Sequence, residues 1–320
     1  MKRFFKAFLL LCITMFILAS VYIGIQLIRA PRLDGADVVP DGYLTVILDR
    51  EGNQMDSLHD SESNRIYTEL TYIPDHLKNA FVAIEDARFY SHKGIDVKGI
   101  CRAFFRGVLK GFHFHQGAST ITQQLIKNNV LSTWTSEVTF NDRLSRKIQE
   151  IYLSLRLETI YDKDWILENY LNTINLGGGT RGVMVASRYY FGKDVNELNL
   201  CEAAMIAGIT KNPSGYNPFL HPEDSLDRMK LVLKAMYEQE YIDKESYDKA
   251  LATDVLSHLD KGHEVLGSKV FSYFEDALLE TLVDDLCEKK ELDQSQAWNL
   301  IYSGGLTIHA TMDKAFQKIC

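Results

Sequence analysis

The sequence opens with an apolar run that is long enough to cross a lipid bilayer. Residues 7–28 carry no charged side chain, and about 20 apolar residues in an α-helix span the hydrocarbon core. Basic residues precede the run, namely Lys2, Arg3 and Lys6. The positive-inside rule therefore predicts a cytoplasmic N-terminus, with the rest of the chain on the other side of the membrane.

A cleaved signal peptide is the alternative interpretation of this run. The run is longer than a usual signal h-region, and the residues that follow it, 29–32, contain no A-x-A cleavage site. We therefore predict a retained single-pass anchor.

Length and composition limit the number of domains and exclude some classes of protein. A chain of 320 residues has room for an anchor, one sizeable domain and a further segment. The formal net charge of −8, without a basic stripe, argues against a nucleic-acid-binding protein. The five cysteines are scattered and form no C-x-x-C pair, so the sequence predicts neither a disulfide framework nor a zinc site.

The segment after the anchor predicts a small amount of β-structure followed by helices. Residues 43–48 and 53–58 flank a turn that contains Gly52, which is typical of a β-hairpin. Beyond the hairpin, helical periodicity continues almost to residue 303. The expected fold class is therefore mainly α.

A helix near residue 80 places a carboxylate at the edge of an apolar stripe. The stripe consists of residues at i, i+3, i+4 and i+7, namely Leu77, Ala80, Phe81 and Ile84. Glu85 borders this stripe, whereas the helical pattern puts Asp86 on the far side, where we expect it to be solvated or capping. Gly94 ends the segment. A carboxylate beside a core suits proton transfer because desolvation raises the pKa of such a group, although a plain boundary residue gives the same pattern.

Residues 117–128 predict a second helix with a distinctive start. Thr120 and Gln123 form a capping-box pattern, and the free N–H groups of a helix N-terminus can bind a phosphate. Lys127 could add a mobile positive charge. Residues 129–141 show little periodicity and predict a mobile loop beside the site, which could act as a lid.

Two further helical segments combine apolar and charged residues. Residues 97–114 are largely apolar but carry basic residues at i, i+4 and i+8, which suits either a solvated face or a surface that meets anionic lipid headgroups. A later stripe is formed by Leu144, Ile148, Ile151 and Leu155. Arg143, Lys147 and Glu150 share the flank beside that stripe, where the alternative is a surface ladder of salt bridges.

The first two of these motifs resemble those of a known family. Residues 85–94 match E-D-x-x-F-x-x-H-x-G, and residues 117–128 match G-x-S-T-I-T-Q-Q-x-x-K-N. The chain thereby resembles the peptidoglycan glycosyltransferases (glycosyltransferase family 51), which form the N-terminal catalytic domain of class A penicillin-binding proteins and also occur alone. Three further motifs follow in the family's order: R-K-x-x-E at 146–150, I-L-E-x-Y-L-N at 166–172, and A-A-x-x-A-G-x-x-x-x-P-x-x-Y-N-P at 203–218. Asn175, Leu176 and Arg181 depart from the aromatic residues that many relatives carry there.

The resemblance implies a fold, a reaction and a set of site residues. The fold would be a lysozyme-like, two-lobed helical domain with an N-terminal transmembrane helix and a small β-hairpin. The reaction would be inverting polymerisation of lipid II into glycan strands, with release of undecaprenyl pyrophosphate. Glu85 and Glu150 would be the catalytic carboxylates. The substrate-binding residues would be Ser119, Thr120, Gln123, Gln124, Lys127, Asn128, Arg143, Arg146 and Lys147.

The resemblance also implies partners and a location. Lipid II, the growing glycan strand and the bacterial plasma membrane would be partners, and cell-wall synthesis proteins could join them, but no nucleic acid. Family members often need a divalent cation, Mg or Mn, although no closed metal site stands out in this sequence, and no organic cofactor is expected. The catalytic domain would lie outside the cytoplasm, on a single-pass plasma-membrane anchor.

These patterns predict an order of domains along the chain. We expect a cytoplasmic tail (1–6), an anchor (7–28), a stalk with the hairpin (29–59), the glycosyltransferase domain (60–240) and a helical extension (241–320). The extension includes a strand at 304–313 that resembles the link toward a transpeptidase domain, which we expect to follow this sequence. Ser246 and Lys249 match the S-x-x-K pattern of transpeptidases by chance, because no K-T-G or S-x-N partner exists.

Two rival functions come from other classes. A lysozyme-like peptidoglycan hydrolase would use water in place of the acceptor sugar, and an inactive membrane scaffold for cell-wall synthesis would need no catalytic residues. The presence of Glu85, Lys147 and Glu150 favours an active enzyme.

Overall fold

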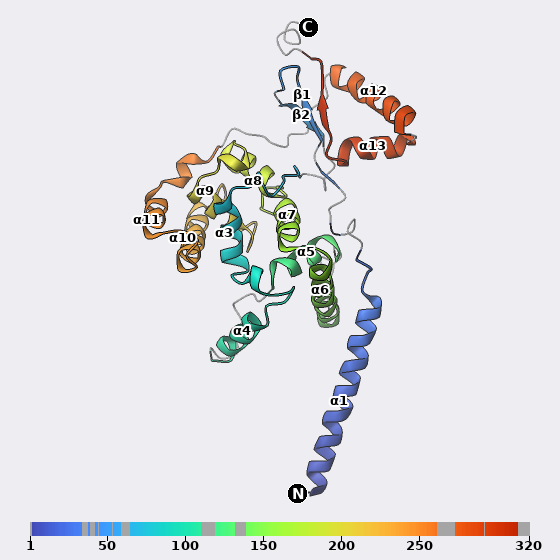
Figure 1. Ribbon diagram of the computed structural model, residues 1–320, viewed down its shortest axis with the longest axis vertical. Helices are drawn as coiled ribbons and strands as arrows, with labels where there is room; N and C mark the ends of the chain where they lie inside the picture. The colour runs from blue at the N-terminus through green and yellow to red at the C-terminus, as the bar shows by residue number, and fades with distance from the viewer. Residues whose placement is uncertain are drawn as a thin grey trace. The chain divides into compact units, whose positions relative to one another are not determined.

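The computed structural model describes residues 2–33, 38, 42–43, 45–52, 54–58, 65–109, 119–131, 139–260, 273–290 and 292–312. The chain divides into two compact units. Unit one comprises Met1–Val38 and Arg88–Ile166, and unit two comprises Val39–Ala87 and Leu167–Cys320. Figure 1 shows that the described elements are mainly helices, with one small sheet, which confirms the predicted fold class.

The described part of unit one contains the long N-terminal helix α1 (Lys2–Arg29) and, before α6, the following shorter helical elements. These are the 3₁₀ turn η1 (Phe89–Ser91), α4 (Val97–Leu109) and α5 (Ile121–Asn129), and α6 spans Phe140–Ile160. Among the described residues, one helix is long and apolar enough to cross a membrane, and it runs from Phe4 to Arg29 within α1. Its length and composition are those predicted for the anchor.

The last two turns of α1 are attached to α6 by polar side chains. The Tyr22 hydroxyl donates to Asn141 Oδ1 at 2.8 Å, and the Ser145 hydroxyl donates to Gln26 Oε1. Gln149 Nε2 also donates to the Gln26 carbonyl oxygen at 3.4 Å. Gln26 is therefore a buried, hydrogen-bonded polar residue within an otherwise apolar run. A cleaved leader needs no such contacts, so they favour a retained helix.

The buried face of α6 differs from the predicted one. Its buried residues are Glu150, Leu153, Ser154 and Leu157. Leu144 and Leu155, two members of the predicted stripe, are 41% and 42% exposed. The reason is a close backbone contact: Gly94 has φ +82°, and a Cβ atom there would lie 2.6 Å from the Ser154 carbonyl oxygen. The face that packs is therefore the one with the small residue Ser154, because only that face admits the neighbouring backbone.

Helix α3 (Asp75–Glu85) ends earlier than the sequence pattern predicts. Leu77, Ala80 and Phe81 of the apolar stripe are buried, as expected. Asp86 already has non-helical dihedral angles, with φ −152° and ψ 71°, and its N–H bonds to the Val82 carbonyl. Of the two predicted alternatives for Asp86, solvated or capping, the first is wrong because the residue is only 5% exposed, whereas Asp86 does occupy the C-cap position of α3.

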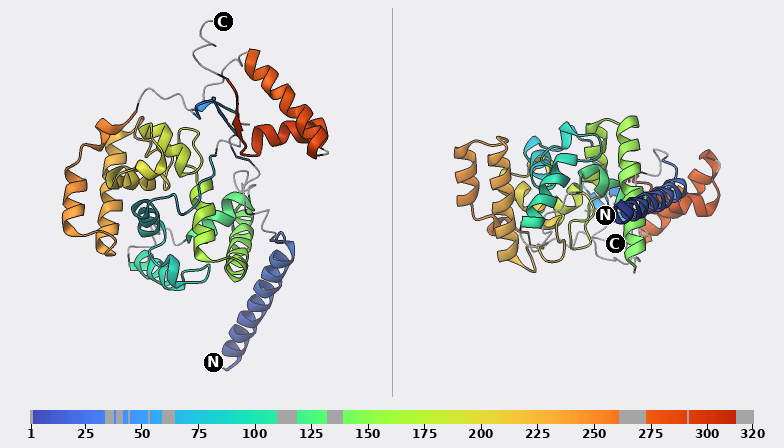
Figure 2. Two further views of the ribbon diagram at one scale, coloured as in Figure 1. Left: turned by 45° about the horizontal axis from the view of Figure 1, so that its top comes forward. Right: turned by 90° about the horizontal axis from the view of Figure 1, so that it is seen from below.

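Unit two contains one apolar helix, α9 (Leu200–Ile209). Other helical elements described in this unit include α3, α7 (Lys163–Thr173, which begins in unit one), α8 (Val183–Phe191), η3 (Val195–Glu197), α10 (Pro222–Glu238), α11 (Lys244–Ala252) and η4 (Val255–His258). Every residue of α9 after Leu200 is buried, and Asn199 with Glu202 forms the predicted capping box. Helices α3 and α10 pack against α9, and both views of Figure 2 show α10 and α11 side by side.

The small residues of α9 permit the predicted close approach of a neighbouring helix. A Cβ atom on Gly208 would lie 3.0 Å from Cγ of Arg228 in α10. Any larger residue at position 208 would therefore displace the Arg228 side chain.

The sheet joins two distant parts of unit two. Strands β1 (Thr45–Leu48) and β2 (Gln54–Leu58) form the predicted antiparallel hairpin, and β3 (Thr307–His309) lies parallel to β1. Helices α12 (Tyr273–Lys290) and α13 (Gln294–Ser303) share a core with the sheet (Figure 1). The strand near residue 307 was predicted, but its parallel pairing with β1 was not.

The fourth sequence motif holds the segment after the hairpin against α7. Glu168 accepts hydrogen bonds from the Tyr67 hydroxyl at 2.5 Å and from the Leu70 N–H at 2.7 Å. The Asn172 side chain bonds both the N–H and the carbonyl of Thr68, at 2.8 and 2.9 Å. Both polar residues are thus used by the fold, in agreement with the structural interpretation of this motif.

Candidate functional site

The N-terminus of α5 is fixed by its own side chains. Thr120 Oγ1 accepts from the Gln123 N–H at 3.2 Å, and Gln123 Oε1 accepts from the Thr120 N–H at 3.0 Å, which is the predicted capping box. Thr120 Oγ1 also donates to the Gly94 carbonyl at 2.7 Å. Because Thr120 and Gln123 are buried, this network holds the neighbouring residue Ser119 in place. Gln123 Nε2 has no hydrogen-bond partner among the described residues.

A basic cluster lies where α6 contacts Ser119, the residue before the N-cap of α5. It consists of Ser119, Arg146, Lys147 and Glu150. Lys147 Nζ donates to Ser119 Oγ at 2.9 Å and forms a close ion pair with Glu150 Oε1. Arg146 donates from a terminal guanidinium nitrogen to Glu150 Oε2 at 2.8 Å. Four residues predicted from the second and third motifs are therefore brought together.

The charges of the basic cluster differ in their exposure to water. The Glu150 side chain is 2% exposed, whereas those of Arg146 and Lys147 are 21% and 38% exposed. The carboxylate is thus enclosed between two cations that still reach solvent. This arrangement carries a net positive charge and can bind an anion such as a phosphate group.

The other predicted binding residues of unit one lie on α5 and at the start of α6. Gln124, Lys127 and Asn128 are partly exposed on α5. Arg143 is exposed in the first turn of α6, where its Nε donates to the Thr139 carbonyl at 3.5 Å. Residues 132–138 of the predicted lid (129–141) lie outside the described residues, as do the first two residues of the second motif. At the ends of the predicted lid, Asn129 belongs to α5, and Phe140 and Asn141 belong to α6.

Glu85 is the last residue of α3, in unit two, where α3, α9 and α10 pack together. Its Oε1 accepts from the Thr210 hydroxyl at 2.6 Å and lies 4.0 Å from a guanidinium nitrogen of Arg228. The Glu85 side chain is 15% exposed. The carboxylate is therefore held at the rim of the core, as predicted, by a hydroxyl and a guanidinium group.

The buried side chain of Tyr170 lies near the two carboxylates of the first motif, Glu85 and Asp86. Burial, followed by the charges of Glu85 and Asp86, raises the pKa of the Tyr170 phenol well above its ordinary value. Its ring packs edge-on against Phe81 of α3, with centroids 6.1 Å apart. Tyr170 therefore remains a neutral phenol at any physiological pH.

Sequence reasoning missed the two residues that hold Glu85. The sequence could have indicated a role for Arg228, because it lies on the buried face of α10 with Ser225, Met229 and Val232. A charged side chain on such a face needs a partner. Arg228 Nε donates to the Gly208 carbonyl at 3.4 Å. The sequence pattern does not indicate a role for Thr210, since a threonine just after a helix is common and its contact with Glu85 depends on the fold.

The glycine-rich loop after the fourth motif packs tightly against the turn of the fifth. A Cβ atom on Gly177, which has φ +77°, would lie 2.4 Å from the Pro213 carbonyl oxygen. Leu176 is fully buried, and its carbonyl accepts from the Tyr190 hydroxyl at 2.8 Å. Asn175 and Arg181 form an isolated β-bridge. The positions that depart from the family pattern therefore build the loop itself.

The described residues do not assemble a metal-binding group. None of them forms a group of three or more His, Cys, Asp or Glu side chains at ligand spacing. Glu150, the predicted carboxylate near the leaving group, already pairs both oxygens with cations. The divalent cation stays a prediction, and no chemical step is derived through it.

Comparison with known proteins yields one family. A family model described as Transglycosylase matches residues 51–237, more than half of the chain. Penicillin-binding protein 1A of Clostridium tetani is 40% identical over 314 residues, covering 93% of this chain and 38% of the relative. Penicillin-binding protein 1A of Clostridium perfringens (strain 13) is 39% identical over 332 residues, covering 99% of this chain and 47% of the relative. Penicillin-binding protein 1F of Bacillus subtilis is 34% identical over 317 residues, covering 99% and 41%. The chain thus spans less than half the length of each of these relatives.

The hydrogen bond between Thr210 and Glu85 predicts a difference between two substitutions. Thr210→Val keeps the shape of the side chain but removes the hydroxyl, so it should destabilise the protein by about 1 kcal/mol and lower the melting temperature by about 2–4 °C. Thr210→Ser keeps the hydroxyl and should lie close to wild type. Thermal unfolding of the full chain in detergent measures both, and equal shifts would show that the hydrogen bond contributes nothing.

Proposed function

Because the chain belongs to the transglycosylase family, we propose that it is a peptidoglycan glycosyltransferase that joins lipid II into glycan strands. The observation that carries this proposal is the pairing of Glu85 with Thr210 and Arg228, at the position of the family's first motif. The basic cluster around Lys147 and Glu150 supports it from the second and third motifs.

The reaction needs a base at the acceptor. The acceptor's sugar hydroxyl attacks the anomeric carbon of the donor, its oxygen forms the new glycosidic bond, and configuration inverts at that carbon. In our proposal the Glu85 carboxylate accepts the proton of that hydroxyl. Thr210 and Arg228 hold the carboxylate in one orientation, so that no reorganisation is needed at the moment of transfer.

The reaction also needs cations at the leaving group. When the anomeric bond to the donor breaks, its electron pair goes to undecaprenyl pyrophosphate, which departs as an anion. Arg146 and Lys147 are partly exposed cations that can neutralise this charge, with Lys127 and Arg143 adding mobile charges from α5 and α6. The buried Glu150 would act by fixing the positions of Arg146 and Lys147.

An assay of the products distinguishes the proposed polymerase from the two rival functions. Purified full chain incubated with lipid II should yield long glycan strands. A lysozyme-like hydrolase would shorten existing strands instead, and an inactive scaffold would leave lipid II unchanged.

We further propose that α1 anchors the chain in the plasma membrane with residues 1–6 in the cytoplasm. Lys2, Arg3 and Lys6 support this orientation through the positive-inside rule. A reporter enzyme that is active only outside the cytoplasm, fused after Cys320, should therefore be active in cells. Activity of a cytoplasm-restricted reporter at the same position would reverse the proposed orientation.

The proposed base predicts different effects for the two adjacent carboxylates. Glu85→Gln keeps the shape and one acceptor oxygen but cannot take a proton, so polymerisation should fall by roughly 10²–10⁴-fold with little change in melting temperature. Asp86→Asn alters a buried group at the end of α3 and should lower the melting temperature. Glycan synthesis and thermal unfolding measure the two effects. Full activity of Glu85→Gln would disprove the proposed base.

The proposed leaving-group role predicts a contrast between two paired lysines. Lys147→Ala removes a cation of the basic cluster and should reduce polymerisation by about 10²-fold or more. Lys163→Ala removes a cation that pairs with the nearly buried Glu158 at 2.7 Å and lies outside the basic cluster. This control should lose stability but keep activity. Equal activity losses in the two variants would indicate a general structural effect.

A further inference from the structure

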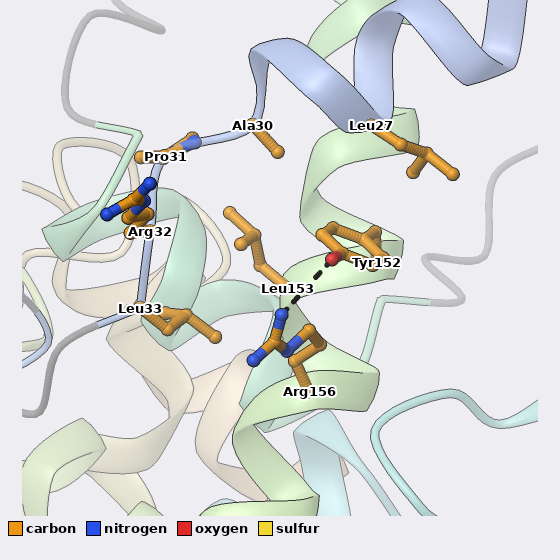
Figure 3. Close-up of a pocket in the computed structure, with 8 residues that line it drawn as sticks. All are labelled: Leu27, Ala30, Pro31, Arg32, Leu33, Tyr152, Leu153 and Arg156. Carbon is orange, nitrogen blue, oxygen red and sulfur yellow. Dashed lines mark hydrogen bonds between the residues drawn. The ribbon is translucent and has the colours of Figure 1, made fainter.

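Unit one contains a cavity that the proposed catalytic machinery does not use. It has a volume of about 420 Å³ and lies between the end of α1 and the middle of α6. Its lining is formed by Leu27, Ala30, Pro31, Arg32, Leu33, Tyr152, Leu153 and Arg156. Figure 3 shows Leu153 between the residues that follow α1 and the side chains of Tyr152 and Arg156 on α6.

The position of this cavity along the chain sets its depth in the membrane. The apolar span ends at Arg29, and a helix rises only 1.5 Å per residue. Leu27 therefore lies at the edge of the hydrocarbon core, and Arg32 and Leu33 lie at the level of the lipid headgroups. This depth follows from the end of the span and holds for either orientation of α1.

The polar part of the lining is positively charged. Arg32 and Arg156 are both exposed, and neither forms an ion pair with a carboxylate in the described part of the chain. Arg156 donates to the Tyr152 hydroxyl oxygen at 3.3 Å. That hydroxyl can then donate its own proton to a third group. Two guanidinium groups and one oriented hydroxyl are all groups that can donate hydrogen bonds to the oxygens of a phosphate group.

The remaining lining is apolar and begins at the membrane edge. Leu27 belongs to the span, Leu153 is 1% exposed, and Leu33 is partly buried. A free phosphate ion would leave these side chains without a partner, whereas the glycerol backbone and first methylenes of a lipid would contact them. The volume is within the range of cavities that enclose small organic groups.

We propose that this cavity binds one anionic phospholipid, with its phosphate between Arg32, Arg156 and the Tyr152 hydroxyl. The glycerol and upper acyl chains lie against Leu27, Leu33 and Leu153. A bound phospholipid would thus bridge α1 and α6 at the membrane surface. A zwitterionic headgroup binds less well, because its ammonium group meets two guanidinium groups.

The first experiment measures lipid preference with the wild-type chain. The purified full chain in uncharged detergent micelles is mixed with equal amounts of phosphatidylglycerol and phosphatidylcholine of identical acyl chains, and native mass spectrometry counts the lipids retained. We expect one phosphatidylglycerol to be retained in preference, by about tenfold, because charge-assisted hydrogen bonds distinguish the two headgroups. Equal retention of both lipids would overturn the proposal.

The second experiment assigns the preference to the two arginines. Arg32→Gln and Arg156→Gln should each reduce phosphatidylglycerol retention about tenfold, while Arg156→Lys should keep part of it. The matched control is Arg50→Gln combined with Lys230→Gln, which removes two positive charges from exposed positions in unit two. Wild-type retention by the Arg32→Gln, Arg156→Gln double variant, or equal loss in the control, would contradict the assignment.

A third measurement separates a lipid site from a free-anion site. Inorganic phosphate, added in excess over phosphatidylglycerol, should not displace the retained lipid, because it cannot replace the apolar contacts. Displacement of the lipid by this excess of phosphate would show a simple anion site and overturn the proposal. Retention of lipid does not depend on polymerisation, so failure of this proposal and failure of the proposed glycosyltransferase activity give different results.

Discussion

The close contact between the backbone of Gly94 and that of Ser154 is the constraint on which the arrangement of unit one depends. A side chain at position 94 would collide with the Ser154 carbonyl, so glycine lets α6 approach with the face that carries Ser154. The same glycine accepts a hydrogen bond from Thr120, which caps α5. One residue of the first motif thus contacts both Thr120 of the second motif and α6, the helix that carries the third motif. Because Glu150 lies on the buried face of α6, this packing also removes its carboxylate from water, and Arg146 and Lys147 must then neutralise it.

In unit two, the carboxylate of Glu85 is stabilised differently from that of Glu150. Glu150 is enclosed between cations, whereas Glu85 lies at the end of a helix, with one hydroxyl bond at 2.6 Å and a guanidinium group at 4.0 Å. A carboxylate held in this way keeps its orientation and still reaches solvent at the rim of the core. The small residue Gly208 makes this possible, because it gives Arg228 the space to extend past α9. The two glutamates of the motifs therefore have different environments: Glu85 still reaches solvent, whereas Glu150 is buried between two cations whose positions it fixes.

Local signals in the sequence predicted the local structure well. The capping boxes at Thr120 and Asn199 and the hairpin at Gly52 each depend on residues within a few positions of one another, so propensity and pattern were sufficient. Three of the failures involved distant contacts. The buried face of α6 was set by Gly94, and the partner of Glu85 lies on α10, far along the chain. The parallel pairing of β1 with β3 joins residues more than 250 positions apart. Asp86 was misplaced because helical periodicity was continued one residue beyond the helix.

Helix α6 carries the features that connect these observations to the membrane. Asn141, Ser145 and Gln149 recur every four residues and bond the end of α1, while Lys147 and Glu150 lie on a different part of the helix surface. A rigid helix of 21 residues fixes the axial distance between these two sets of side chains. The basic cluster is therefore held at a set depth relative to the end of the apolar span. The proposed glycosyltransferase would use a donor whose polyprenyl chain stays in the bilayer, so its proposed pyrophosphate-binding cations would have to lie at a fixed depth. Tyr22 and Gln26 contribute to that depth by attaching α1 to the helix that bears Arg146 and Lys147.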